Sequence, residues 1–189
     1  MTTLVVGYPP FACARQDGRP TPDATVELRP ARRDELPAIR ELAGVIWHAH
    51  YPGIISVAQI DYMLERGYAI AGLAEFIDRP DRGLLLALAK GEPAGFAAWL
   101  VTMRADEAKL DKLYVLQACQ RTGIGRALLA RVAGDARAAG ATTLILNVNK
   151  RNTQAIRAYE KHGFTIREAV VNDIGQGYVM DDFVMAKPL

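Results

Sequence analysis

The chain has 189 residues, half of them apolar, and a formal net charge of +2. This length fits one domain with a buried core, and the scattered basic residues do not form the clustered basic face of a nucleic-acid-binding protein. No apolar run approaches the length of a membrane span, and the N-terminus lacks the basic flank and long apolar core of a signal peptide. We therefore expect a soluble, cytoplasmic protein with no nucleic-acid or membrane partner.

The cysteines and histidines do not form a recognisable metal-binding pattern. Cys13 and Cys119 are far apart and make neither a CxxC pair nor a zinc motif, so we expect free thiols in a reducing compartment. His48 and His50 are two residues apart, and no third ligand is apparent near them. The sequence therefore predicts no metal site.

In chain order, residues 1–24 come first and contain four prolines and two glycines, which interrupt any regular period. We expect them to form a flexible arm before a single domain over residues 25–189. Apolar alternation and continuous apolar runs predict strands over residues 26–29, 84–90, 94–103, 110–115, 143–148, 165–171 and 178–185. Helical spacing with capping residues predicts helices over residues 34–46, 56–64, 69–77, 124–139 and 153–162.

The most informative segment is the junction between the strand over 110–115 and the helix that follows it. Its loop carries Gln120, Gly123 and Gly125 directly before the helix. The first N–H groups of a helix have no internal partner and attract anions, and glycine allows a phosphate to approach the backbone closely. The dinucleotide pattern fails because Leu128 stands at its last glycine position, and the Walker lysine is absent. Glycines that serve only a tight turn are the structural alternative.

A second motif lies in the helix over residues 153–162 and its flanks. Asn152 stands where a helix N-cap belongs, and Tyr159 follows about two turns later on the same face. Gly163 fits the left-handed position after a helix, which would pack Phe164 against Tyr159. A half-buried tyrosine whose hydroxyl finds some partner is the structural alternative.

From Val26 to the C-terminus, the two motifs in this order resemble the GNAT superfamily of acyl-CoA-dependent N-acetyltransferases. The resemblance implies an α/β fold with a mixed, mostly antiparallel sheet of about six to seven strands flanked by helices. It also implies acetyl-CoA as co-substrate, direct transfer to an amine, and Tyr159 as the acid that protonates the CoA thiolate. The implied cofactor-binding residues are Leu113, Tyr114, Val115, Gln120, Arg121, Thr122, Gly123, Ile124, Gly125, Arg126, Ala127, Asn152 and Tyr159.

The general base and the acceptor site are less clearly marked. Asp111 is a candidate base because it alternates with Leu113 and Val115 on the cofactor strand unless a bulge intervenes. The resemblance places His48 and Tyr51 beside the acceptor. A salt-bridged strand residue is the alternative for Asp111, and a residue packed at a helix end is the alternative for His48.

The acceptor itself is an amine whose identity the sequence leaves open. Segments around residues 47–55 and 173–185 are similar to bacterial acetyltransferases of the polyamine-acetylating type. Asp173, Asp181 and Asp182 can attract a cationic amine, and a solvated turn with an edge strand explains them equally well. Small amines, amino acids, aminoglycosides and protein N-termini are all compatible, as is a non-catalytic acyl-CoA-binding module. The late strands also permit a homodimer through edge pairing.

Overall fold

The computed structural model describes residues 26–104 and 106–189, so the predicted N-terminal arm lies outside the described residues. The strands are β1 (Val26–Pro30), β2 (Arg82–Ala89), β3 (Glu92–Val101), β4 (Glu107–Val115), β5 (Thr143–Asn149), β6 (Thr165–Gly175) and β7 (Tyr178–Pro188). The helices are α1 (Leu36–His50), α2 (Val57–Gly67), α3 (Ile70–Ala74), α4 (Ile124–Ala138) and α5 (Thr153–Lys161), with 3₁₀ turns η1 (Arg33–Glu35) and η2 (Gln117–Cys119).

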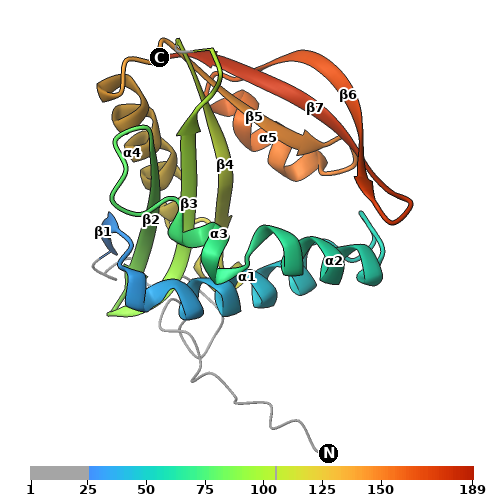
Figure 1. Ribbon diagram of the computed structural model, residues 1–189, viewed down its shortest axis with the longest axis horizontal. Helices are drawn as coiled ribbons and strands as arrows, with labels where there is room; N and C mark the ends of the chain where they lie inside the picture. Colours follow the sequence, from blue (N-terminus) through green and yellow to red (C-terminus); the bar gives the residue numbers. More distant parts are fainter. Residues whose placement is uncertain (1–25, 105) are drawn as a thin grey trace, which may run out of the picture.

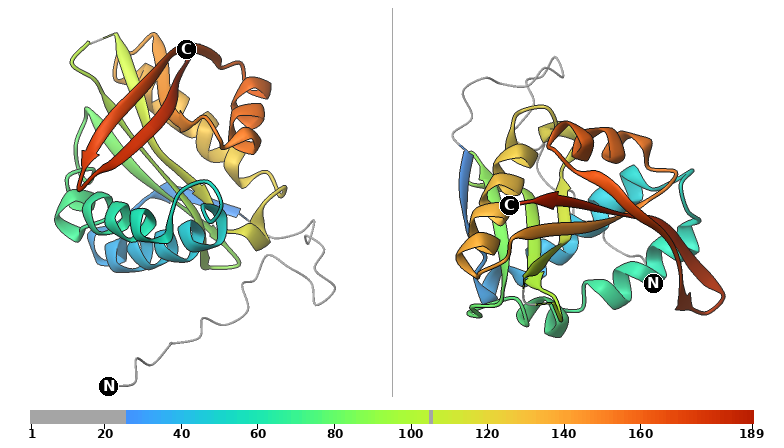
Figure 2. Two further views of the ribbon diagram at one scale, coloured as in Figure 1. Left: turned by 90° about the vertical axis from the view of Figure 1, so that its right-hand side faces the viewer. Right: turned by 90° about the horizontal axis from the view of Figure 1, so that it is seen from above.

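A seven-stranded sheet in the order β1-β2-β3-β4-β5-β7-β6 forms the centre of the fold. All neighbouring strands are antiparallel except β4 and β5, which run parallel and are connected by α4. Helices α1 to α3 lie on one side of the sheet and α4 and α5 on the other (Figures 1 and 2). The expected mixed, mostly antiparallel sheet flanked by helices is therefore confirmed.

Apolar helix faces build the core on both sides of the sheet. Ile39 and Ala43 of α1 are fully buried on one side, and Leu128, Val132 and Ala136 of α4 are fully buried on the other. These positions recur every three or four residues, which is the spacing that predicts each helix from the sequence. Among the described residues, no helix combines the length and the apolar character needed to cross a membrane.

Two tight hairpins set the lengths of the antiparallel strands. Lys90 and Gly91 both have positive φ between β2 and β3, and Gln176 and Gly177 do the same between β6 and β7. Two consecutive positive φ angles define the turn whose twist matches two-residue hairpins. The last hairpin is longer than the sequence predicts, and its tip lies beside α2 (Figure 1).

The parallel pairing of β4 with β5 is short, and this shapes the centre of the molecule. Glu107–Leu110 pairs with residues 143–146, and the register ends there. Beyond that point, Lys112–Val115 pairs only with β3, while the end of β5 pairs only with β7. The two strands diverge (Figure 1), which leaves one backbone edge of β4 without a neighbouring strand.

A bulge in β4 lies where the strands separate. Trp99 of β3 pairs with Leu110, and Ala98 pairs with Lys112, so Asp111 is the extra residue. The bulge therefore breaks the simple alternation that grouped Asp111 with Leu113 and Val115. Nearby, a Cβ atom added to Gly95 of β3 would lie 2.7 Å from the backbone oxygen of Tyr114. The close approach of β3 and β4 at this point requires glycine.

We expect Gly95→Ala to lower the free energy of unfolding by about 1–3 kcal/mol, because backbone must shift to admit the methyl group. Gly134→Ala is the matched control, since a Cβ atom at Gly134 in α4 meets no atom within 4 Å. This control should raise the stability by about 0.5–1 kcal/mol. Urea denaturation of both variants measures the effect, and equal stability of the two would contradict the proposed close packing.

Candidate active site

The turn between η2 and α4 presents free backbone donors at the helix N-terminus. Gly123 is the N-cap residue with φ +95°, and no side chain caps the helix. The first helical hydrogen bond joins the N–H of Ala127 to the carbonyl of Gly123 at 2.9 Å. The N–H groups of Ile124, Gly125 and Arg126 precede that bond, which makes this helix end suited to an anion.

Side chains around this turn hold its shape. The hydroxyl of Thr122 donates to the carbonyl of Cys119 at 2.7 Å, and the amide of Gln120 donates to the carbonyl of Val115 at 3.4 Å. The Ile124 side chain is buried in the core, so only its backbone faces a ligand. Cys119 is itself buried and disulfide-bonded. The free thiol expected from the sequence is therefore wrong for this residue.

Two cavities meet at the opening between β4 and β5. The first, of about 760 Å³, lies between α1, the end of β4 and the start of α5. The second, of about 480 Å³, lies between the diverging strands, α1, α5 and the β6–β7 hairpin. Six residues line both cavities, namely Ile46, His50, Val115, Gln120, Asn152 and Gln154. A path therefore runs from the anion-binding turn to the hairpin side of the sheet.

Helix α5 places its two signature residues on this path. The side-chain oxygen of Asn152 accepts the N–H of Ala155 at 3.3 Å, which is the expected N-cap bond, and its amide lies 3.1 Å from Nε2 of His50. At the other end, the N–H of Phe164 donates to the carbonyl of Tyr159, and Gly163 has φ +86°. The Tyr159 and Phe164 rings pack edge to face with centroids 5.6 Å apart. This ending is the Schellman motif that the sequence predicts.

Tyr159 lines the second cavity together with other tyrosines. Burial raises the pKa of its hydroxyl well above the ordinary value, and the charge of Tyr51 adds to this effect. Burial likewise raises the pKa values of Tyr51, Tyr68 and Tyr114, whose hydroxyls cluster beside it. The Tyr51 and Tyr114 oxygens are 3.4 Å apart. All four phenols therefore stay protonated near neutral pH.

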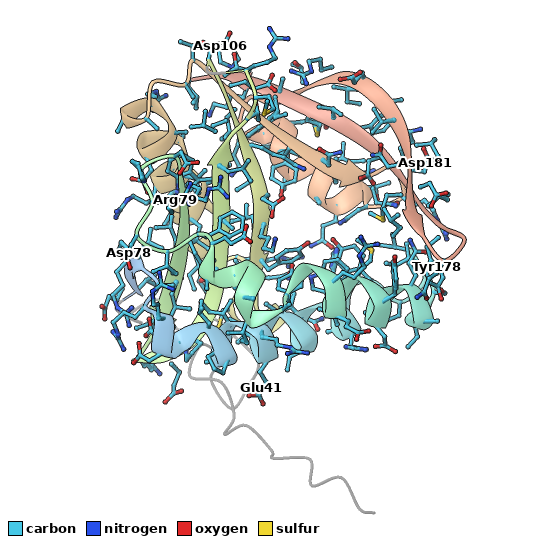
Figure 3. The ribbon with its side chains drawn as sticks, in the orientation of Figure 1. Glu41, Asp78, Arg79, Asp106, Tyr178 and Asp181 are labelled. Atoms are coloured by element: carbon cyan, nitrogen blue, oxygen red, sulfur yellow. The ribbon has the colours of Figure 1, made fainter. Side chains whose placement is uncertain are left out.

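The β6–β7 hairpin closes the far side of the second cavity by contact with α2. Tyr62 and Arg66 both donate to the carbonyl of Ile174, at 2.5 and 2.6 Å. Gln59 donates to the carbonyl of Val179 at 2.9 Å, and the Tyr62 and Tyr178 rings pack 5.3 Å apart. Figure 3 shows Tyr178 beside the hairpin tip, next to the end of α2. The hairpin thereby brings Ile174 and Met180 into the cavity lining.

The structure gathers most of the sequence-predicted residues into one region, but not all. The second cavity is lined by Tyr51, Asp111, Leu113, Tyr114, Val115, Gln120, Asn152 and Tyr159. The remaining predicted cofactor residues, Arg121 to Ala127, form the turn beside it. His48 is separate, because it lies on the opposite face of α1 from His50 and contacts Asp61 of α2 at 2.9 Å. The hydrogen bond with the Gly44 carbonyl, followed by Asp61, raises the pKa of His48.

Sequence reasoning missed His50 and did not separate the three C-terminal aspartates. His50 falls on the cavity face because positions 46, 47 and 50 share one side of a helix, whereas position 48 does not. Asp182 is buried in the second cavity, while Asp181 is exposed and paired with Lys150. Asp173 is exposed and accepts the N–H of Gly175. Alternation along β7 places Asp181 and Asp182 on opposite faces of the sheet, but the sequence does not say which face is buried.

Asp111 lies in the second cavity but already has cationic partners. Its carboxylate pairs with the adjacent Lys112 and lies 3.8 Å from Lys109. The Lys112 ammonium also lies over the Tyr68 and Phe76 rings. Glu107, at the start of β4, is buried and paired with Arg167 of β6. The structural alternative considered for Asp111, a salt-bridged strand residue, describes its surroundings.

We expect Asn152→Ala to destabilise the fold by about 1 kcal/mol, because α5 loses its side-chain cap. Asn152→Ser should retain most of the stability, since a serine hydroxyl can accept the same N–H but cannot reach His50 equally well. Chemical denaturation of the two variants tests this assignment. Equal destabilisation would mean that the contact with His50, rather than the cap, accounts for the effect of Asn152.

Comparisons with known proteins agree with this geometry. Residues 45–164 match the model of the acetyltransferase (GNAT) family. An uncharacterized N-acetyltransferase of Mycobacterium bovis is 30% identical over 158 residues, which cover 82% of this chain and 97% of the relative. The ribosomal protein bS18-alanine N-acetyltransferase of Escherichia coli is 40% identical over 74 residues, covering 39% of this chain and 49% of that enzyme.

A solved structure extends the match to almost the whole fold. The PaiA N-acetyltransferase from Thermoplasma acidophilum, crystallised in complex with coenzyme A, superposes with a TM-score of 0.75 and 25% identity. The superposition covers 87% of this chain and 99% of that one. The chain therefore belongs to the GNAT family and is an N-acetyltransferase that uses acetyl-CoA as its co-substrate.

Proposed function

We propose that this enzyme transfers the acetyl group of acetyl-CoA directly to the primary amine of a small, polyamine-like or amino-acid-like molecule. The observation that carries the proposal is the separation of β4 from β5 beyond Leu110 and Leu146. It creates a path with a helix end suited to an anion on one side and, on the other, a cavity whose lining includes Asp111 and Asp182. Donor and acceptor can therefore approach the same point from opposite sides.

The donor side fits acetyl-CoA in two respects. The uncapped N-terminus of α4, with Arg121 and Arg126 beside it, suits a pyrophosphate. The free backbone edge of Asp111–Val115 suits the amide-containing pantetheine arm, which can pair with it like an added strand. Gln120 and Asn152 line the path between these two places. The proposal thus gives the predicted cofactor residues two tasks: the turn before α4 holds the pyrophosphate, and the edge of β4 holds the pantetheine arm.

The acceptor side favours a slim amine over a bulky surface. The second cavity has a volume of about 480 Å³ and is covered by the hairpin fastened to α2. Met63, Ile174 and Met180 supply apolar wall, while Tyr51, His50 and Asp182 supply polar groups. The similarity of the segments around residues 47–55 and 173–185 to polyamine-acetylating enzymes favours a polyamine-like acceptor, and the bS18-alanine relative supports a peptide N-terminus as the competing outcome.

Tyr159 is the residue proposed to protonate the CoA thiolate that leaves. The burial that raises its pKa keeps the phenol protonated throughout the neutral range. An acid must hold its proton until the carbon–sulfur bond breaks, and a protonated phenol meets that requirement. Contact with Phe164 fixes the ring on the side of α5 that faces the cavity.

We expect Tyr159→Phe to lower kcat by about 10²-fold or more, because general acid catalysis is lost while the ring packing remains. The Kd for acetyl-CoA should change less than about threefold. Tyr178→Phe is the matched control, since it also removes a phenol but lies on the hairpin tip outside the cavity lining. Unchanged kcat in the Tyr159 variant would remove this tyrosine from the mechanism.

The decisive test of the function is thiol release from acetyl-CoA against a panel of amines. Spermidine, spermine, single amino acids and alanine-headed peptides should be compared at equal concentration. Release that depends on the small amines supports the proposal, and release that depends only on peptides would replace the acceptor class. Silence across the panel, with acetyl-CoA still raising the Tm, would favour a non-catalytic binder.

A further inference from the structure

A buried carboxylate lies in the acceptor cavity without the partners that burial normally demands. Asp182 of β7 is only 5% exposed and lines the second cavity. Within the described part of the chain, its Oδ1 atom has no hydrogen-bond partner and almost no contact with solvent. A buried carboxylate oxygen that is left unpaired is costly, so a fold retains one mainly where the free oxygen has a use.

The surroundings of Asp182 orient the carboxylate without neutralising it. Burial raises its pKa above that of an ordinary aspartate, although a hydrogen bond from Asn147 of β5 acts in the opposite direction. Asn149 is its pairing partner on β5, and Val170 is its partner on β6, so the backbone is held from both sides. The backbone of Asp182 is therefore held in place from both sides, and its side chain keeps one acceptor atom, Oδ1, that no described residue uses.

Asp111 differs from Asp182 in this respect, although both line the cavity. The oxygens of Asp111 are engaged by Lys112 and lie near Lys109. The Asp111 carboxylate therefore already has cationic partners within the protein, whereas the free oxygen of Asp182 has none among the described residues. Asp182 has its nearest aspartate neighbour in Asp181, but that side chain points to solvent and pairs with Lys150 (Figure 3).

We propose that Asp182, rather than Asp111, takes the proton that the acceptor ammonium must lose. The inference rests on the function proposed above. It extends that function by assigning the base to a strand that also forms the acceptor wall. The amine is thus deprotonated in the same place where Tyr51 and Met180 confine it.

With this assignment, every proton in the reaction is accounted for. A nitrogen–hydrogen bond of the ammonium breaks, and its proton goes to Oδ1 of Asp182. The neutral amine attacks the thioester carbon to form the carbon–nitrogen bond, and the carbon–sulfur bond breaks. Tyr159 gives its proton to the thiolate and is restored by the second proton of the former amine. Asp182 then releases its proton to solvent, so one proton is produced for each amide formed.

Several other charged or titratable groups face Asp182, and a pH profile must be interpreted with all of them in view. The groups that act on Asp182 or are acted on by it are Lys109 of β4, Lys150 after β5, Asp181 of β7 and Tyr51 of α1. The same cavity also holds His50, Tyr68, Asp111, Lys112, Tyr114 and Tyr159. The burial-raised pKa of Asp182 shifts the acidic limb of kcat/KM upward from the range of an exposed carboxyl group. The raised phenol pKa values keep the tyrosines out of that limb.

The test is Asp182→Asn in the full-length enzyme, with spermidine or the best amine from the panel as acceptor. We expect kcat/KM at pH 7 to fall by about 10²- to 10³-fold, with the Kd for acetyl-CoA unchanged. The acidic limb governed by Asp182 should be replaced by one governed by the amine, so that activity rises tenfold per pH unit up to the pKa of the amine itself, near about 10. The Tm at pH 7 should not fall, because the variant no longer buries a charge.

Two controls separate this role from its alternatives. Asp181→Asn changes the neighbouring exposed aspartate and should retain the activity and the acidic limb, with the limb displaced only toward lower pH because the charge of Asp181 raises the pKa of Asp182. Asp111→Asn should retain the acidic limb, because the base is intact. Loss of the limb in the Asp111 variant but not in the Asp182 variant would overturn the proposal, as would an active Asp182→Asn enzyme with an unchanged profile. A wild-type enzyme that acetylates no amine would instead refute the proposed function, and this inference with it.

Discussion

The short parallel contact between β4 and β5 is the constraint on which the rest of the site depends. Four residue pairs join the strands, and the next residues turn to β3 on one side and β7 on the other. A longer ladder would pair every backbone group and leave no opening between the strands. Because the strands separate next to α4, the free strand edge and the free helix N–H groups lie close together. One topological event thus supplies both halves of the proposed donor site.

Sequence reasoning recovered the parts of the site that are local in the chain. The turn around Gly123 and the helix from Asn152 to Phe164 carry their geometry in short motifs, because caps and helix endings are set by neighbouring residues. The seven strands were also predictable from apolar patterning, whereas their arrangement in one mixed sheet was an expectation from the family resemblance. Asp182 was grouped with Asp173 and Asp181 as able to attract a cationic amine and was not singled out, because its burial depends on the register between β7 and strands distant in sequence. Asp111 was grouped with Leu113 and Val115 by simple alternation, and the bulge that breaks this grouping cannot be read from alternation alone.

The cavity imposes a stability cost that its chemistry explains. Tyr51, Tyr114 and Tyr159 place hydroxyl groups in a largely dry region, and Asp182 places a carboxylate there. A core built for stability alone would use apolar side chains of the same size at such positions. Polar side chains are thus buried in the same small region where β4 and β5 separate. A break in the sheet that coincides with buried polar groups is typical of a functional site.

The two sides of the site also differ in how the chain supplies them. The proposed donor side comes mainly from β4 through α5, with the end of α1 beside it, whereas two outer segments, α2 before this stretch and the β6–β7 hairpin after it, contribute only to the proposed acceptor cavity. Substitutions in the two outer segments can therefore reshape the acceptor cavity while the donor stretch stays constant. The family match ends at residue 164, just before the hairpin begins. This arrangement allows acceptor preference to change among relatives through substitutions in the outer segments, while the stretch from β4 through α5 stays the same.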